Sequence, residues 1–101
     1  NARNGQALTT FGPLNIRKER FKLDKGPLDD MCSCKVCTNY SRAYIRHLHH
    51  VGEPLGGQLV TYHNLWFYMR MVENARSSIL NGKFDEFFEN SMKAILRCLS
   101  A

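Results

Sequence analysis

The feature that most constrains this chain is a cluster of three cysteines, since Cys32, Cys34 and Cys37 fall within six residues and the 101-residue sequence has only one other. Cysteines one and three residues apart on a turn can direct their thiolates at one ion, but they are too close together to form separate disulfides. Zn²⁺ in a structural site takes four nitrogen or sulfur ligands in a tetrahedron. The sequence therefore predicts a metal site with three ligands in this cluster and a fourth elsewhere.

The length suits one small domain or part of one, in which a bound metal would add to a modest core. The longest apolar run, residues 65–69, is too short to span a bilayer. There is no basic-then-apolar signal segment, and clustered cysteines fit a reducing compartment better than a disulfide scaffold. We therefore expect a cytoplasmic metalloprotein without a membrane partner. The chain begins at Asn1 without Met, which predicts a processed or excised piece.

Positive charge is concentrated early in the chain, whose net charge is +5 and whose pI is near 9.2. The basic residues concerned are Arg3, Arg17, Lys18, Arg20, Lys22 and Lys25. A basic strip of this kind favours a polyanion such as RNA or DNA. A solvated basic surface without a partner is equally open for any single one of these residues.

The first quarter of the chain reads as β-structure, in residues 7–25. Apolar and polar residues alternate in residues 14–17 and again, after charged residues, in 21–23, and glycines and prolines lie before and after these two runs. These patterns predict a small antiparallel sheet with its cationic side chains facing water. Residues 28–37 are expected to form a loop that carries the cysteines.

A helical period follows and gives the chain an α+β class. One helix is predicted from about Asn39 to Val51, ended by Gly52. A second helical stretch runs from Leu55 towards Val60. Thr61 is then expected to cap a new helix that ends at residues 81–82, and a last helix is predicted from about Phe84 to Leu99.

Geometry selects the fourth metal ligand from among the histidines, which are His47, His49, His50 and His63. His47 lies ten residues beyond Cys37, which is roughly 15 Å along a helix at 1.5 Å per residue. His63 returns on the descending arm of a helix–turn–helix, on what is expected to be the first turn of a helix. We therefore predict His63 as the ligand, with a hydrogen-bonded structural histidine as the alternative. Cys98 is expected to be a buried thiol.

Several sequence motifs together are similar to a known family. They are C-x-C-x₂-C from Cys32 to Cys37, Ser41-Arg42-Ala43-Tyr44, Thr61-x-His63-Asn64-Leu65, Gly12-Pro13-Leu14-Asn15-Ile16-Arg17 and Gly26-Pro27-Leu28-Asp29. Arg76, Ile79, Gly82 and Phe84 agree with the family's tail. The whole chain resembles tRNA-guanine transglycosylase, also called queuine tRNA-ribosyltransferase, of the bacterial type.

The resemblance implies a (β/α)₈-barrel enzyme with a zinc-binding subdomain, of which this chain is the C-terminal segment. Residues 1–27 are expected to form the basic β-region, 28–66 the zinc subdomain and 67–101 helices that close the barrel. Such enzymes exchange the wobble guanine of tRNA for 7-aminomethyl-7-deazaguanine, on the way to queuosine. One structural Zn²⁺ and no open position for catalytic water are implied.

The family's two catalytic aspartates are expected outside this chain, together with the part that binds the 7-deazaguanine substrate. Asp24, Asp29 and Asp30 do not match their motifs, and Asp29-Asp30 is predicted to be a solvated loop. No catalytic residue is therefore expected here, and the chain alone is predicted to be inactive.

Two binding roles are carried over from the resemblance. Residues 1–5 match the end of a loop that contacts the anticodon nucleotides, and Arg3 is the predicted tRNA contact, with an exposed terminal arginine as the alternative. Tyr40, Tyr44 and His47 are expected to meet a second subunit of a homodimer. Packing of these three side chains inside the subdomain is the alternative.

Two other functions remain open at this level. The chain could be a freestanding zinc module that binds RNA or protein without catalysis. It could also belong to a non-catalytic paralogue that partners a catalytic subunit. The reading frame upstream of Asn1 distinguishes these possibilities from the enzyme.

Overall fold

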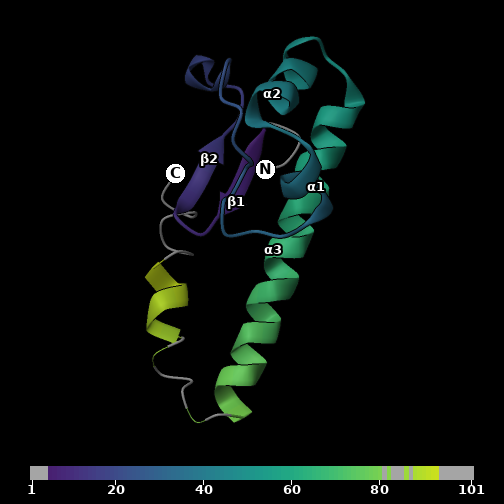
Figure 1. Ribbon diagram of the computed structural model, residues 1–101. Helices are drawn as coiled ribbons and strands as arrows, with labels where there is room; N and C mark the ends of the chain where they lie inside the picture. Colours follow the sequence, from purple (N-terminus) through teal and green to yellow (C-terminus); the bar gives the residue numbers. More distant parts are fainter. Residues whose placement is uncertain (1–4, 81, 83–85, 87, 94–101) are drawn as a thin grey trace.

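The computed structural model describes residues 5–80, 82, 86 and 88–93. They form an α+β arrangement in which a hairpin and three helices surround a common core (Figure 1). The elements are β1 (Gln6–Thr9), β2 (Gly12–Asn15), a 3-10 helix (Glu19–Phe21), α1 (Lys35–Asn39), α2 (Arg42–His50) and α3 (Pro54–Leu80). Residue 86 and residues 88–93 are also helical.

The predicted antiparallel sheet is present but smaller than expected. β1 pairs with β2 so that Ala7 lies opposite Leu14, and both side chains are buried. The prediction that residues 21–23 continue the sheet is wrong. The N–H of Phe21 donates to the carbonyl of Lys18 at 3.1 Å, so this segment closes into a helical turn. The turn buries the Phe21 ring beneath the Arg42 guanidinium, 5.4 Å away, instead of placing it in a third strand.

The reversal between α2 and α3 lies where it was predicted. Gly52 has a φ of +76°, a left-handed conformation that favours glycine at a helix end. The chain then turns back so that α3 runs alongside α2 (Figure 1). A Cβ at Gly56 would lie 3.0 Å from Cδ2 of His49 and 3.1 Å from its backbone nitrogen. The missing side chain of Gly56 therefore allows the close contact between the two helices.

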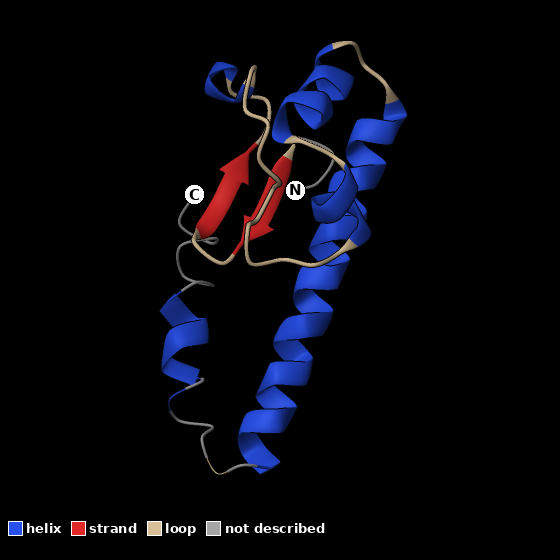
Figure 2. Cartoon of the chain, in the orientation of Figure 1, coloured by secondary structure: helices blue, strands red, loops and turns tan. Residues whose placement is uncertain are grey.

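α3 is one continuous helix, which corrects two predictions (Figure 2). Thr61 does not cap a new helix, because its hydroxyl donates to the carbonyl of Gly57 at 2.8 Å, one turn earlier in the same helix. His63 therefore lies well inside α3 and not on a first turn. Gly56 and Gly57 lower the helix propensity of this region, and they are tolerated because α3 packs against α2, β1 and α1.

The core lies between the hairpin, α1, α2 and the first third of α3. Its fully buried side chains include Ile16, Leu28, Ile45 and Val60. No helix in the described part of the chain is long and apolar enough to cross a membrane. The helix predicted from Phe84 to Leu99 falls largely outside the described residues, as do Arg3 and Cys98.

Candidate metal centre

The cysteine spacing follows from a tight turn that leads into α1. Cys34 is the N-cap of α1, and its Sγ accepts a hydrogen bond from the N–H of Cys37 at 3.4 Å. Cys32 precedes it on a turn in which its own N–H donates to the carbonyl of Asp29 at 3.1 Å. Cys37 itself lies in α1 and not in the predicted loop. A turn followed by one helical turn brings the three sulfur atoms to one side of the backbone.

α3 brings a histidine to these cysteines. Nδ1 of His63 lies 3.7 Å from Sγ of Cys32, 3.6 Å from Sγ of Cys34 and 3.3 Å from Sγ of Cys37. The four donor atoms all lie within 4.8 Å of one another, and His63 is fully buried. In the described part of the chain, no other histidine belongs to this group. His47, His49 and His50 lie on α2, away from the cysteines.

The second ring nitrogen of His63 determines the role of the first. Nε2 lies 2.7 Å from the carbonyl oxygen of Leu8 on β1, and a carbonyl can only accept a hydrogen bond. Nε2 therefore carries the proton. Burial lowers the pKa of His63 below its ordinary value, although the Leu8 carbonyl and the charge of Asp29 act in the opposite direction. A neutral imidazole thus presents the Nδ1 lone pair to three sulfur atoms.

This donor set fits a tetrahedral Zn²⁺ site. One nitrogen lone pair cannot satisfy three thiols by hydrogen bonding, whereas one central ion satisfies all four donors. Zn–S bonds of about 2.3 Å and Zn–N bonds of about 2.05 Å give S···N edges of about 3.6 Å in a tetrahedron. The observed S···N distances are 3.3–3.7 Å. Burial raises the pKa of the Cys32 and Cys37 thiols, so metal binding has to displace their protons.

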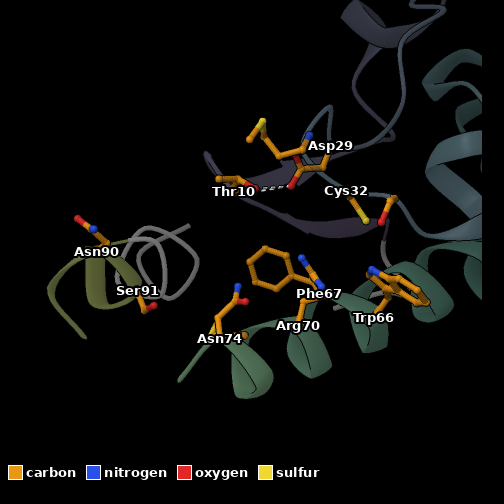
Figure 3. Close-up of a pocket in the computed structure, with 12 residues that line it drawn as sticks. Thr10, Asp29, Cys32, Trp66, Phe67, Arg70, Asn74, Asn90 and Ser91 are labelled. Atoms are coloured by element: carbon orange, nitrogen blue, oxygen red, sulfur yellow. Dashed lines mark hydrogen bonds between the residues drawn. The ribbon is translucent and has the colours of Figure 1, made fainter. Parts of the chain in front are cut away.

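Asp29 is not the solvated residue that the sequence suggested, because it is only 2% exposed. Its Oδ2 accepts hydrogen bonds from the N–H of Thr10 at 2.7 Å and from the Thr10 hydroxyl at 2.8 Å (Figure 3). Its Oδ1 accepts from the N–H of Met31 at 2.9 Å. Asp29 thereby joins the hairpin tip to the turn that carries Cys32. Nothing in the pair Asp29-Asp30 distinguishes this buried carboxylate from its exposed neighbour.

A hollow of about 410 Å³ opens beside the metal centre (Figure 3). Asp29 and the half-buried Cys32 lie on one side of it, and Trp66 and Arg70 of α3 lie on the other. Cys32 is therefore the ligand candidate nearest to solvent, since Cys34 and Cys37 are buried.

The residues expected to meet a second subunit lie at the end of α1 and on α2. The Tyr40 ring stacks on the Tyr44 ring with centroids 5.5 Å apart. Tyr44 is 41% exposed and His47 is exposed, whereas Tyr40 is half-buried and follows the end of α1. The ring pair is thus accessible on one face.

The basic residues near the start lie mostly outside the sheet. Arg17, Lys18, Arg20, Lys22 and Lys25 are all exposed, and they follow β2 around the 3-10 helix. Their exposure is compatible with both alternatives, binding of a polyanion and a solvated surface without a partner.

The family model and the relatives that match this chain have the same description. Residues 1–97 match a protein-family model described as queuine tRNA-ribosyltransferase. A queuine tRNA-ribosyltransferase of Novosphingobium aromaticivorans is 53% identical over 87 residues, which are 86% of this chain and 23% of that protein. One of Neisseria gonorrhoeae is 46% identical over 99 residues, 94% of this chain and 27% of that protein. One of Zymomonas mobilis is 49% identical over 90 residues, 89% of this chain and 23% of that protein. The chain thus spans about a quarter of the length of these relatives.

Proposed function

Since the chain belongs to the queuine tRNA-ribosyltransferase family, we propose that it is the zinc-bearing C-terminal segment of a tRNA-guanine transglycosylase. The observation that carries this proposal is the convergence of three cysteines and His63 inside the stretch that matches the family. Cys32, Cys34, Cys37 and His63 would hold one Zn²⁺. The whole protein would exchange the wobble guanine of tRNA for 7-aminomethyl-7-deazaguanine, with its catalytic aspartates outside this chain.

The role proposed for the metal is structural. Four protein donors complete a tetrahedron and leave no position for a reacting water. An ion held by the three cysteines around the start of α1 and by His63 in the first half of α3 would clamp these two elements together. A freestanding zinc module is not favoured, because the relatives contain the matching segment within proteins about four times its length.

The exposed basic residues support a role in tRNA binding. The side chains of Arg17, Lys18 and Arg20 lie close in sequence and open to solvent, where phosphates could reach them. Arg3 remains the predicted contact to the anticodon loop. The expected result of removing one of these charges is weaker tRNA binding with a smaller salt dependence.

The stacked tyrosines support a homodimer. Tyr44 and His47 are exposed on one face, and aromatic side chains are enriched at the centres of protein interfaces. We propose that Tyr40, Tyr44 and His47 contact a second subunit.

An apolar face on the second half of α3 supports contact with the proposed barrel. Met69, Val72 and Ile79 are 62–70% exposed and recur at helical spacing on one side of α3. Residues 67–101 would cover the barrel with this face, residues 28–66 would form the zinc subdomain and residues 1–27 the basic β-region.

The test measures zinc content and base exchange together. The full-length protein should contain one zinc per chain and incorporate labelled guanine into tRNA, and the 101-residue chain alone should show no exchange. Turnover by the 101-residue chain would place catalytic residues within it and contradict the proposal. A full-length protein that folds without zinc would contradict the metal assignment.

A further inference from the structure

β1 has one hydrogen-bonding edge that β2 does not use. Leu8 lies opposite Pro13, which has no N–H to donate, and both the N–H and the C=O of Leu8 are directed to α3. An open strand edge carries polar groups that need partners when they are covered. Here α3 packs along that edge, and β1 lies beside the first half of α3 (Figure 1).

Two consecutive residues of α3 supply those partners. The side-chain Oδ1 of Asn64 accepts from the N–H of Leu8 at 2.9 Å, and its Nδ2 donates to the carbonyl of Gln6 at 3.0 Å. Nε2 of His63 donates to the carbonyl of Leu8 at 2.7 Å. The Asn64 amide thus pairs with β1 as the peptide group of a neighbouring strand would. Both partners fix its orientation, because an N–H only donates and a carbonyl only accepts.

The backbone of Leu8 connects Asn64 to the candidate metal centre. Its N–H, in the peptide group before the Cα, is held by Asn64, and its C=O, in the peptide group after the Cα, holds the proton of His63 on Nε2. A shift of this strand segment would move the carbonyl away from Nε2 and free the imidazole to rotate or to change tautomer. Groups that orient a ligating histidine through its second nitrogen tune metal affinity strongly.

We propose that Asn64 is a positioning residue of the metal centre: by holding the edge of β1, it keeps the Leu8 carbonyl on Nε2 of His63 and Nδ1 directed at the three cysteines. Asn64 itself contacts no metal donor. This inference rests on the zinc site proposed above and extends it from the four ligands to the strand that orients one of them.

The test compares Asn64→Ala with Asn15→Ala in the full-length, zinc-loaded protein. Asn15 is exposed on β2 and accepts a hydrogen bond from the N–H of Arg17 at 3.0 Å, so its loss weakens the same hairpin away from α3. Zinc transfer to a chromophoric chelator should be about tenfold faster for Asn64→Ala than for wild type, and unchanged for Asn15→Ala. Equal transfer rates for the two variants would show that Asn64 acts only on the hairpin and would overturn the proposal.

Two spectroscopic readouts separate positioning from loss of stability. The visible absorption bands of the cobalt-substituted protein should shift in Asn64→Ala, and the Nε2 proton of His63 should exchange faster with solvent in nitrogen-15 correlation spectra. Unchanged bands and unchanged exchange would overturn the proposal.

If Asn64→Ala does not fold, Asn64→Asp replaces it, since it retains the acceptor for Leu8 but loses the donor for Gln6. Faster zinc transfer in Asn64→Asp supports the proposal, and a wild-type rate overturns it. Wild-type protein without zinc would instead refute the proposed metal site.

Discussion

The region around the candidate metal centre and the distal half of α3 are built in opposite ways. We call residues 5–64 the metal-bearing region and residues 65–80 distal α3. Every described side chain that is buried lies in the metal-bearing region. In distal α3, large apolar side chains such as Met69 and Leu80 are 70% and 78% exposed.

The metal-bearing region has a core of its own, whereas distal α3 has none among the described residues. In the metal-bearing region, short elements are held by a common core, by polar contacts from Asp29 and Asn64, and by the converging metal donors. Distal α3 has an apolar face but nothing in the described residues that covers it. A helix with such a face gains most of its stability from packing, so we expect distal α3 to depend on parts of the protein outside the described residues.

The largest expected effect follows from loss of the metal, which should unfold the metal-bearing region. Structural zinc sites contribute about 10–16 kcal/mol of apparent binding free energy at neutral pH. Removal of zinc by EDTA, or Cys34→Ser, should therefore unfold residues 5–64, as measured by circular dichroism alongside zinc content. Ser33→Ala, between two ligand candidates and exposed, is the control and should retain one zinc per chain. A folded Cys34→Ser protein without zinc would contradict the structural role.

The same residue type in the two regions provides the second test. Ile45 is fully buried and Ile79 is 62% exposed. Ile45→Ala should lower the free energy of unfolding by about 2–5 kcal/mol, whereas Ile79→Ala in the 101-residue chain should change it by less than about 0.5 kcal/mol. Urea titration measures both. In the full-length protein, Ile79→Ala should become clearly destabilising; if it stays neutral there, distal α3 is not covered.

A third test compares two neighbouring aspartates. Asp29→Asn replaces an acceptor of three hydrogen bonds by a group whose NH₂ faces the donors of Thr10 or Met31, and should cost about 1–3 kcal/mol. Asp30→Asn, at an exposed position, should be neutral. Chemical denaturation of the zinc-loaded protein measures the difference. Equal stability of the two variants would contradict the structural role of Asp29 and support the solvated loop that the sequence predicts.

The smallest effect concerns the link between Asp24 and Arg42 at the start of α2. Oδ2 of Asp24 lies 3.0 Å from Nη1 of Arg42, and the pKa of Asp24 is lowered, first by the N–H of Gly26 and then by Arg42. A lowered carboxyl pKa means that the contribution is present at neutral pH and is lost only as the pH falls below the ordinary value of 3.8. Because the pair is partly exposed, a double-mutant cycle with Asp24→Asn and Arg42→Gln should give less than about 1 kcal/mol. A coupling above 2 kcal/mol would contradict this ranking.

Short-range signals were sufficient for part of the fold and of the site. The cysteine spacing indicated a metal site, Gly52 marked the reversal, and the distance along a helix separated His63 from His47. Each of these depends on local backbone geometry. The sequence was misleading where a residue had two local solutions: Thr61 could cap a helix or bond back within one, and Phe21 could join a strand or close a helical turn.

The sequence by itself thus indicated the four ligand residues of the candidate metal centre and the helical reversal that brings them together, because the cysteine spacing, the glycine at the helix end and the rise along a helix can be read from the chain. Only the tertiary structure decided that Asp29 is buried and that Asn64 pairs with β1. These contacts join residues 19 to 58 positions apart, and they exist only once the core has brought the hairpin against α3 and against the turn that carries Cys32.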